Sequence, residues 1–284
     1  MLVTGATGQL GRLVIEALLD IDPAAKISAI ARDGKAAAAL AARGVHVHVA
    51  DYDRPETLDA AFAGVDRLLL ISSNDLGHRL PQHRNVIDAA RKAGVKLLAY
   101  TSVLHADTST LGLAEEHRQT EAAIRASGVP FVMLRNGWYT ENYAASIPSA
   151  LQHGALLGSA GDGRIASAAR ADYAVAAAKV LLSSQDQAGK IYELAGDASY
   201  TLSEFAAELA RQSGKAVAYK NLPEAEFKAV LVSVGLPEGL AALLADSDAA
   251  ASQDALFDDS RELSALIGRP TTPLTASIAA ALAG

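Results

Sequence analysis

The sequence predicts an α/β fold, with a doubly wound parallel sheet and a smaller, mainly helical unit toward the C-terminus. Strand-like and helix-like segments alternate regularly through the first half of the 284 residues. This alternation is typical of parallel strands joined by right-handed crossovers. Several of the strand-like runs are apolar almost throughout, as expected when helices cover both faces of the sheet. The chain is also long enough to bury one large or two modest cores.

The chain opens with a short apolar strand, a glycine-rich turn and an amphipathic helix. Residues 1–4 read Met-Leu-Val-Thr, and residues 5–11 follow with the spacing G-x-x-G-x-x-G. Gly5 permits a tight turn out of the strand, Gly8 has no Cβ to keep a pyrophosphate away, and Gly11 lets the helix pack closely. The first N–H groups of the helix then attract phosphate. The turn therefore predicts a Rossmann-like dinucleotide site; the plain alternative is an ordinary strand–helix turn.

Five further strand-like runs continue the pattern, and helical patterns fill the gaps between them. The predicted strands are residues 27–31, 45–49, 67–72, 96–101 and 131–135. The predicted helices are residues 34–43, 55–62, 82–93 and 113–127. Two histidines, His46 and His48, share one face of their strand. Without a third ligand they indicate a plain strand surface, and we predict no metal site.

After residue 135 the regular alternation ends. Helices are predicted at 142–152 and 170–183, a loop at 158–163, and strands at 190–194 and 216–221. From Thr201 the chain is mostly helical, because Glu204 completes a capping-box pattern and Pro223 and Pro237 lie near further helix starts. We expect a dinucleotide-binding domain of residues 1–140, joined by about 160–195, and a smaller substrate-covering domain of 141–159 and 196–284.

The composition excludes several classes of function. A formal net charge of −7 argues against nucleic acid as the main partner. The absence of cysteine excludes disulfides, thiolate nucleophiles and cysteine metal sites. The apolar stretches are too short for a membrane span, and the N-terminus resembles a folded strand more than a secretory signal. We therefore expect a cytoplasmic monomer or homodimer that acts on a small molecule.

The second predicted strand ends at the position that distinguishes NAD from NADP in folds of this class. In NAD-binding folds an acid at this place, about 20 residues after the glycine turn, binds the ribose 2′-OH. Here Arg32 takes the place of the acid, and its planar, permanently charged guanidinium suits a 2′-phosphate. The sequence therefore predicts NADPH, with NADH bound more weakly. The alternative is that Arg32 is solvated and Asp33 turns inward to bind NAD.

Polar residues also follow the later strands, at the sheet edge where ligands bind in this class of fold. Asp51 and Tyr52 are adenine-side candidates, although Asp51 equally suits a helix cap before Pro55. The hydroxyl and amide groups of residues 72–74 are expected beside the nicotinamide ribose. The aromatic and amide side chains of residues 136–142 are expected to enclose the nicotinamide.

The proton donor usual in short-chain dehydrogenases, a Tyr followed four residues later by Lys, is absent. None of the eight tyrosines has a lysine at that distance. Hydride addition to a quinone gives a resonance-stabilised anion and needs far less acid catalysis than ketone reduction. His117, with Glu121 one helical turn away, remains a candidate donor. The alternative for this pair is a solvated surface contact.

The whole chain resembles the NmrA-like branch of the atypical short-chain dehydrogenases/reductases. It is most similar to the bacterial type 2 NAD(P)H:quinone oxidoreductases and more distantly to the triphenylmethane dye reductases. The matching features, besides the glycine turn and Arg32, are Ala50-Asp51-Tyr52, Ser72-Ser73, Tyr100-Thr101-Ser102, His117-x-x-Thr120-Glu121, Arg135-Asn136-Gly137-Trp138-Tyr139, Arg170-Ala171-Asp172-Tyr173, Gly235-Leu236-Pro237 and Leu256-Phe257-Asp258-Asp259.

The resemblance implies an NADPH-dependent, two-electron reduction of quinones without flavin. The implied cofactor contacts are Gly5, Ala6, Thr7, Gly8, Gln9, Leu10, Arg32, Ser72, Ser73, Asn74, Asn136, Gly137, Trp138, Tyr139, Thr140, Glu141 and Arg170. No settled general acid accompanies the family, so His117 and Tyr139 are the catalytic candidates. Residues 74–81 are expected to form part of a lid over the cofactor. Arg79 in this loop, and His105 outside it, are candidates for contact with substrate; the alternative for each is ordinary solvation.

Two other functions fit the same residues. An NmrA-type redox sensor binds a nicotinamide cofactor without turning it over, and the missing Tyr-x-x-x-Lys pair permits this. Ser72, Asn136 and Trp138 favour the enzyme, because a sensor needs to hold only the phosphates. A reductase for dyes or other bulky electrophiles is the third possibility, and the sequence does not separate it from a quinone reductase.

Overall fold

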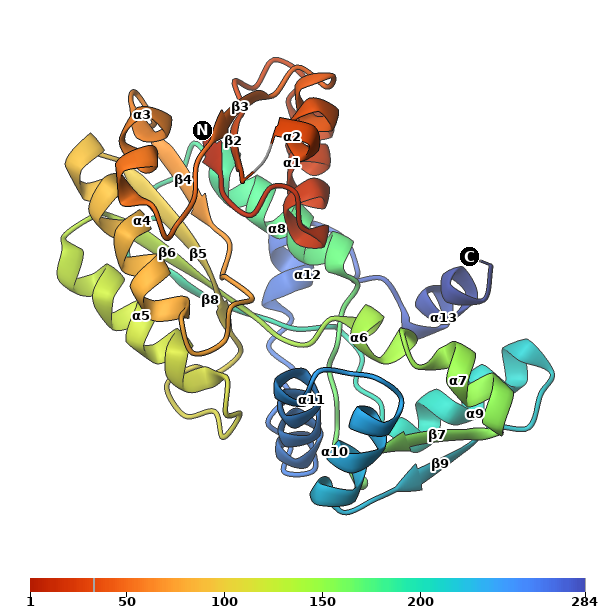
Figure 1. Cartoon of the computed structure of the whole chain (residues 1–284). Helices are drawn as coiled ribbons and strands as arrows, with labels where there is room; N and C mark the ends of the chain where they lie inside the picture. Colours follow the sequence, from red (N-terminus) through yellow and green to blue (C-terminus); the bar gives the residue numbers. More distant parts are fainter. Residues whose placement is uncertain (33, 284) are drawn as a thin grey trace. The chain divides into compact units, whose positions relative to one another are not determined.

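The computed structural model describes residues 1–32 and 34–283 (Figure 1). The chain separates into two compact units. The first unit comprises Met1–Ala106, Glu116–Asn136 and Ala171–Tyr192. The second comprises Asp107–Glu115, Gly137–Arg170 and Glu193–Gly284. Asp33, the alternative NAD-binding acid, lies outside the described residues.

A seven-stranded sheet in the order β3-β2-β1-β4-β5-β6-β8 is the centre of the first unit. Its strands are β1 (Leu2–Val3), β2 (Ser28–Ala31), β3 (His46–Val49), β4 (Arg67–Leu70), β5 (Leu97–Val103), β6 (Phe131–Asn136) and β8 (Ile191–Leu194). The pairs from β3 to β6 are parallel. The strand order reverses between β1 and β4, and ligands in open α/β sheets bind at the carboxyl ends beside such a point.

Helices cover both faces of this sheet, with α3, α4 and α5 on one side and α1 and α8 on the other (Figure 1). The helices are α1 (Gln9–Ile21), α2 (Gly34–Ala41), α3 (Leu58–Phe62, after a 3₁₀ turn at Pro55–Thr57), α4 (Arg79–Ala93), α5 (Ala114–Ser127) and α8 (Arg170–Leu182). The central strand β5 is buried along its whole length. The doubly wound parallel fold predicted from the sequence is thereby confirmed. Helix α4 begins three residues earlier than predicted, because Pro81 is tolerated in a first turn.

The second unit is mainly helical and contains one small sheet, in which β7 (Ala155–Gly158) pairs in parallel with β9 (Ala218–Asn221). Its helices are α6 (Thr140–Ala144), α7 (Ile147–His153), α9 (Leu202–Ser213), α10 (Glu224–Ser233), α11 (Glu238–Ala251), α12 (Glu262–Ile267) and α13 (Leu274–Ala283). The predicted capping box starts α9, where Thr201 and Glu204 each accept a backbone N–H of the other. Among the described residues, no helix is both long enough and apolar enough to span a membrane.

In the second unit one local prediction is wrong and one strand was not predicted. The single helix expected at 142–152 is two helices, α6 and α7. Pro148 lies in the first turn of α7, the one place where its missing N–H and bulky ring are tolerated. Strand β7 was not predicted, because its partner β9 lies about 60 residues further along the chain and the four-residue run Ala-Leu-Leu-Gly has no alternating pattern.

Residues 160–170 fall in the second unit, whereas the sequence expectation grouped them with the first domain. Backbone hydrogen bonds explain this placement. The N–H of Ala166 donates to the carbonyl of Leu256, and the N–H of Ala168 donates to that of Trp138. Residues 107–115 also belong to the second unit, so the chain crosses between the units more often than expected.

Candidate functional site

The glycine turn between β1 and α1 is closed by its own backbone. The N–H of Gly8 donates to the carbonyl oxygen of Gly5 at 3.0 Å. Gly5 has a φ of +58°, a conformation that favours glycine. A Cβ on Gly11 would lie 2.3 Å from that same carbonyl oxygen and 2.7 Å from the Cα of Ala6. Gly11 therefore allows the helix to approach the turn itself.

The first turn of α1 is open to an anion. Its N-cap is the exposed Gly8, no side chain caps it, and no acidic residue lies in the first turn. The free N–H groups and the helix dipole at this end favour a phosphate. Of the expected contacts here, Ala6 and Leu10 are buried, so their side chains serve packing, whereas the side chains of Thr7 and Gln9 are accessible.

Tyr52 turns toward the glycine turn. Its buried hydroxyl lies beside Thr4 and Gly5 and, among the described residues, has no hydrogen-bond partner in good geometry. Burial raises the pKa of Tyr52, so the group stays a neutral donor. The exposed Arg32 lies close enough to oppose this rise. Tyr52 thus lies beside the glycine turn, with the positive charge of Arg32 close to its hydroxyl.

Asp51, the other adenine-side candidate, takes part in the turn after β3. Its carboxylate accepts the N–H of Asp53 at 3.1 Å, and its own N–H donates to the hydroxyl of Thr57 at 3.0 Å. This arrangement is typical of aspartates that stabilise turns. In the structure Asp51 therefore has a local structural role. This role is close to the helix cap that the sequence analysis gave as the alternative to an adenine contact.

The residues after β4 lie next to the glycine turn, because a Cβ on Gly5 would be 3.2 Å from the Cβ of Ile71. The N–H of Ser72 donates to the hydroxyl of Thr101 at 2.9 Å. Ser73 is held by side chains of α4, whereas the Asn74 side chain is exposed. Ser72 and Asn74 are consequently the members of this loop best placed to meet a ligand.

His117 lies inside the protein, only 4% exposed. Its Nε2 is 3.2 Å from a guanidinium nitrogen of Arg79, and its Nδ1 is 2.7 Å from the hydroxyl of Tyr100. Because a guanidinium can only donate, Nε2 accepts and Nδ1 carries the proton. Burial and the charge of Arg79 lower the pKa of His117 well below its ordinary value. The alternative of a solvated surface pair is therefore wrong, and the catalytic role of His117 stays a prediction.

Glu121 binds other partners than His117. Its carboxylate accepts two bonds from Arg135, at 2.9 and 2.7 Å, and one from the hydroxyl of Ser102, at 2.6 Å. Burial alone would raise the pKa of Glu121, but the hydrogen bonds from Arg135 and Ser102 outweigh it and lower the pKa. Glu121 thus ties α5 to the ends of β5 and β6.

In the second unit, the expected contacts after β6 gather around the start of α8. Tyr139 lies under the guanidinium of Arg170, 4.5 Å from the ring centroid. Glu141 accepts the N–H of Arg170 with both carboxylate oxygens, at 2.9 and 3.1 Å. Trp138 and Thr140 are buried, so their side chains serve packing. Tyr139, Glu141 and Arg170 are the half-exposed members of this group. Asn136 is buried at the end of β6, in the first unit.

A second buried histidine, His83 on α4, is also neutral. Its Nε2 accepts the N–H of Ser73 at 2.9 Å, and its Nδ1 lies 3.0 Å from the hydroxyl of Thr120. Burial, with a smaller contribution from Arg79, lowers the pKa of His83 to about 3. The sequence did not predict the buried surroundings of His83 or of His117, because their partners lie on other elements.

These two histidines predict a stability that falls as the pH is lowered. Below pH about 6.5 each of these histidines is protonated in the unfolded chain but stays neutral in the folded chain. Each therefore lowers the free energy of unfolding by about 1.4 kcal/mol for every unit by which the pH falls. Urea unfolding between about pH 7 and 5 measures this slope. In His83→Gln, which cannot titrate, the slope should lessen by one histidine's share; an unchanged slope would contradict the buried neutral state.

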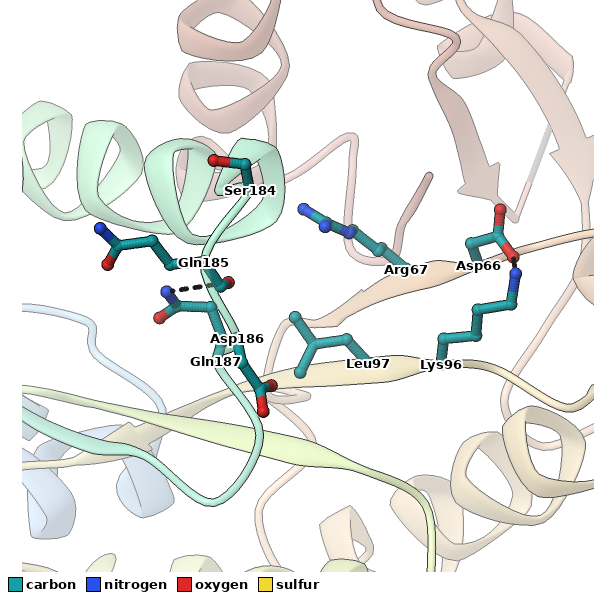
Figure 2. A pocket seen from close by; sticks show the side chains of 8 residues that line it. All are labelled: Asp66, Arg67, Lys96, Leu97, Ser184, Gln185, Asp186 and Gln187. Carbon is teal, nitrogen blue, oxygen red and sulfur yellow. Dashed lines mark hydrogen bonds and ion pairs between the residues drawn. The ribbon is translucent and has the colours of Figure 1, made fainter.

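A surface pocket lies at the opposite end of the sheet, where β4 and β5 begin (Figure 2). Lys96 pairs with Asp66 at 2.7 Å on its rim. The pocket is lined by Asp66, Arg67, Lys96, Leu97, Ser184, Gln185, Asp186 and Gln187. Because ligands of such sheets bind at the carboxyl ends of the strands, this pocket is not the cofactor site. Within the described residues there is no group of three ligands that could hold a metal ion.

Comparisons with known proteins find relatives over nearly the whole chain. The model of the NmrA-like family matches residues 1–274. Quinone oxidoreductase 2 of Escherichia coli strain K12 is 60% identical over 276 residues, 97% of this chain and 96% of that protein. The crystal structure of the E. coli NADPH-dependent quinone oxidoreductase complexed with NADPH has a TM-score of 0.96, at 59% identity and 99% coverage of both chains.

A dye reductase is similar at lower identity. Triphenylmethane reductase of Citrobacter sp., complexed with NADP(H), has a TM-score of 0.94, at 40% identity and 99% coverage of both chains. The resemblance predicted from the motifs is thereby confirmed. Since the family model and these relatives cover nearly the whole sequence, the chain belongs to the NmrA-like family.

Proposed function

We propose that this chain is an NADPH-dependent quinone oxidoreductase. The observation that carries the proposal is the uncapped start of α1 after the glycine turn, with the Tyr52 hydroxyl beside that turn and the charge of Arg32 close to the hydroxyl. Together they supply phosphate-binding N–H groups, a buried donor and a cation, the chemistry that a dinucleotide with a 2′-phosphate needs. The 60% identity to E. coli quinone oxidoreductase 2 supports the choice of acceptor.

We propose a direct two-electron transfer without flavin. The bound nicotinamide would supply the hydride, and the reduced quinone would take one proton to complete the hydroquinone. The resulting anion is resonance-stabilised, so a missing Tyr-x-x-x-Lys pair is tolerable. The chain would therefore mainly orient the cofactor, and in the first unit the glycine turn and the Ser72–Asn74 loop are the groups proposed to do so.

For the proton, Tyr139 is the better placed of the two candidates. The ring of His117 is buried with both nitrogens engaged, whereas Tyr139 is half-exposed beneath the guanidinium of Arg170. A positive charge at that position stabilises an anion close to the tyrosine. His117 contributes to the reaction through the residues it supports.

Arg32 should determine the choice between the two nicotinamide cofactors. Replacing Arg32 with alanine should raise the Kd for NADPH by roughly 10- to 100-fold and leave the Kd for NADH nearly unchanged, because a charged hydrogen bond to the 2′-phosphate is lost. Fluorescence titration measures both constants. The control is Arg43→Ala, which removes an exposed arginine paired with Glu16. Equal ratios in both variants would contradict the role of Arg32.

The redox-sensor alternative differs in turnover. Purified protein, shown by its visible absorbance to carry no flavin, is mixed with NADPH and benzoquinone in a stopped-flow instrument. The proposal expects NADPH to be oxidised faster than in the buffer control. If the protein binds NADPH but does not accelerate its oxidation by benzoquinone, the result contradicts the quinone reductase and supports the redox sensor. A parallel assay with a triphenylmethane dye tests the dye-reductase alternative, which the Citrobacter likeness supports.

A further inference from the structure

The loop of residues 72–74 is fixed by three side chains from the first turns of α4. We infer that Arg79, Gln82 and His83, which we name the Ser73 clamp, are positioning residues that hold this loop in the shape that binds the cofactor. The inference rests on the proposed function, because it assigns the clamp a share of the NADPH affinity.

The clamp engages every polar group of Ser73. The N–H of Ser73 donates to Nε2 of His83 at 2.9 Å, and its hydroxyl donates to the side-chain oxygen of Gln82 at 2.5 Å. Its carbonyl oxygen accepts from Nε of Arg79 at 2.7 Å. Each polar group of Ser73 is therefore already engaged within the protein, and the direct contact of Ser73 with the cofactor stays a prediction.

The position of the held loop explains why its shape matters. β1 and β4 are parallel neighbours, and their carboxyl ends lead into the glycine turn and into this loop. Ile71 packs against Gly5 so closely that a Cβ on Gly5 would lie 3.2 Å from the Cβ of Ile71. Any shift of Ser73 moves the adjoining Ser72 and Asn74. These residues follow the carboxyl end of β4, at the edge of the sheet where ligands bind in this class of fold.

A second layer on α5 supports the clamp. The Nδ1–H of His83 donates to the hydroxyl of Thr120, which in turn donates to the backbone carbonyl of Glu116 at 2.8 Å. Arg79 contacts His117 at 3.2 Å and the Glu116 carboxylate at 3.8 Å. His117, singled out by the sequence as a candidate donor, is thus a positioning residue that acts through Arg79.

The burial of this network argues for a specific task. His83 and Thr120 are fully buried, and Arg79 is 6% exposed. Burying so many polar groups is costly unless each is satisfied, and a satisfied network fixes one conformation. A loop that only connects β4 to α4 needs no such rigidity, whereas a loop that orients a cofactor does.

Two substitutions at His83 separate positioning from stability. In His83→Gln the amide oxygen lies near the place of Nε2 and still accepts the N–H of Ser73, while the bond to Thr120 is lost. In His83→Asn the amide lies near the place of Nδ1 and reaches Thr120, while the Ser73 bond is lost. Each variant therefore keeps one of the two hydrogen bonds, and both remove the ring.

The measurements are the Kd for NADPH, the KM for NADPH and for benzoquinone, and the unfolding midpoint in urea. Both variants should lose similar stability. His83→Asn should raise the Kd and KM for NADPH by roughly 5- to 30-fold, with His83→Gln within about threefold of wild type, because only the first frees the loop. The KM for benzoquinone should not change.

The outcomes distinguish the two levels of proposal. Wild-type protein that fails to bind NADPH overturns the proposed function. Wild-type binding with equal Kd values in two folded His83 variants overturns the clamp. If His83→Asn does not fold, Gln82→Leu replaces it, since it removes the bonds to Ser73, Asp53 and Asp75 at nearly constant volume. It should weaken NADPH binding about 3- to 10-fold, and unaltered binding counts against the clamp.

Discussion

Replacing Glu121 with alanine is expected to lower the free energy of unfolding by about 3–5 kcal/mol, because it removes the buried carboxylate that neutralises the cation of Arg135. Arg135 is 3% exposed and gives two hydrogen bonds to this carboxylate. The hydroxyl of Ser102 loses its acceptor as well. Urea or guanidinium unfolding followed by circular dichroism measures the loss.

Two controls show whether the loss of the carboxylate beside Arg135 is the cause. Arg125 also binds Glu121, but its side chain is 39% exposed, so Arg125→Ala should cost no more than about 0.5 kcal/mol. The double variant with Glu121→Leu and Arg135→Met removes both charges and should recover most of the loss. A loss below about 1 kcal/mol in Glu121→Ala would show that water reaches Arg135.

Replacing Gly11 with alanine should destabilise the first unit by about 2–4 kcal/mol and weaken NADPH binding at least about 10-fold. The added Cβ would lie 2.3 Å from the carbonyl oxygen of Gly5 and 2.7 Å from the Cα of Ala6. Both are backbone atoms, so the turn must move away from α1, and the N–H groups move with it. Thermal unfolding and NADPH titration measure the two effects.

A helical glycine elsewhere provides the matched control. Gly239 lies in the first turn of α11, and a Cβ added there would meet no described atom within 4 Å. Gly239→Ala should therefore stabilise the protein by up to about 1 kcal/mol through helix propensity, with NADPH binding unaltered. If Gly11→Ala behaved like Gly239→Ala, the close approach of α1 to the turn would be refuted.

Much of the candidate site was readable because its parts are local in sequence. The glycine turn needs a strand, three small residues and a helix in succession, and each has its own pattern. Arg32 could be proposed as the residue that binds the 2′-phosphate because that position depends only on where the next strand ends. The alternation of β and α segments likewise predicted the sheet, since crossovers have one hand.

The parts that the sequence did not reveal depend on residues that meet across elements. His117 was paired with Glu121 because they are one helical turn apart, yet the fold places Arg79 and Tyr100 against His117, and Arg135 against Glu121. A helix periodicity says which residues share a face and not what lies opposite. The same limit hid the Ser73 clamp, whose members look like an ordinary helix start.

The sequence by itself determined the fold class, the glycine turn between the first strand and helix, and the family, because these follow from short-range pattern and from motifs contiguous in the chain. Only the tertiary structure decided which side chains are buried and paired. It made His117 a neutral buried residue, and it placed Tyr52 beside the glycine turn. Burial and charge at a side chain are set by neighbours distant in sequence, and the desolvation of a polar group depends on all of them together.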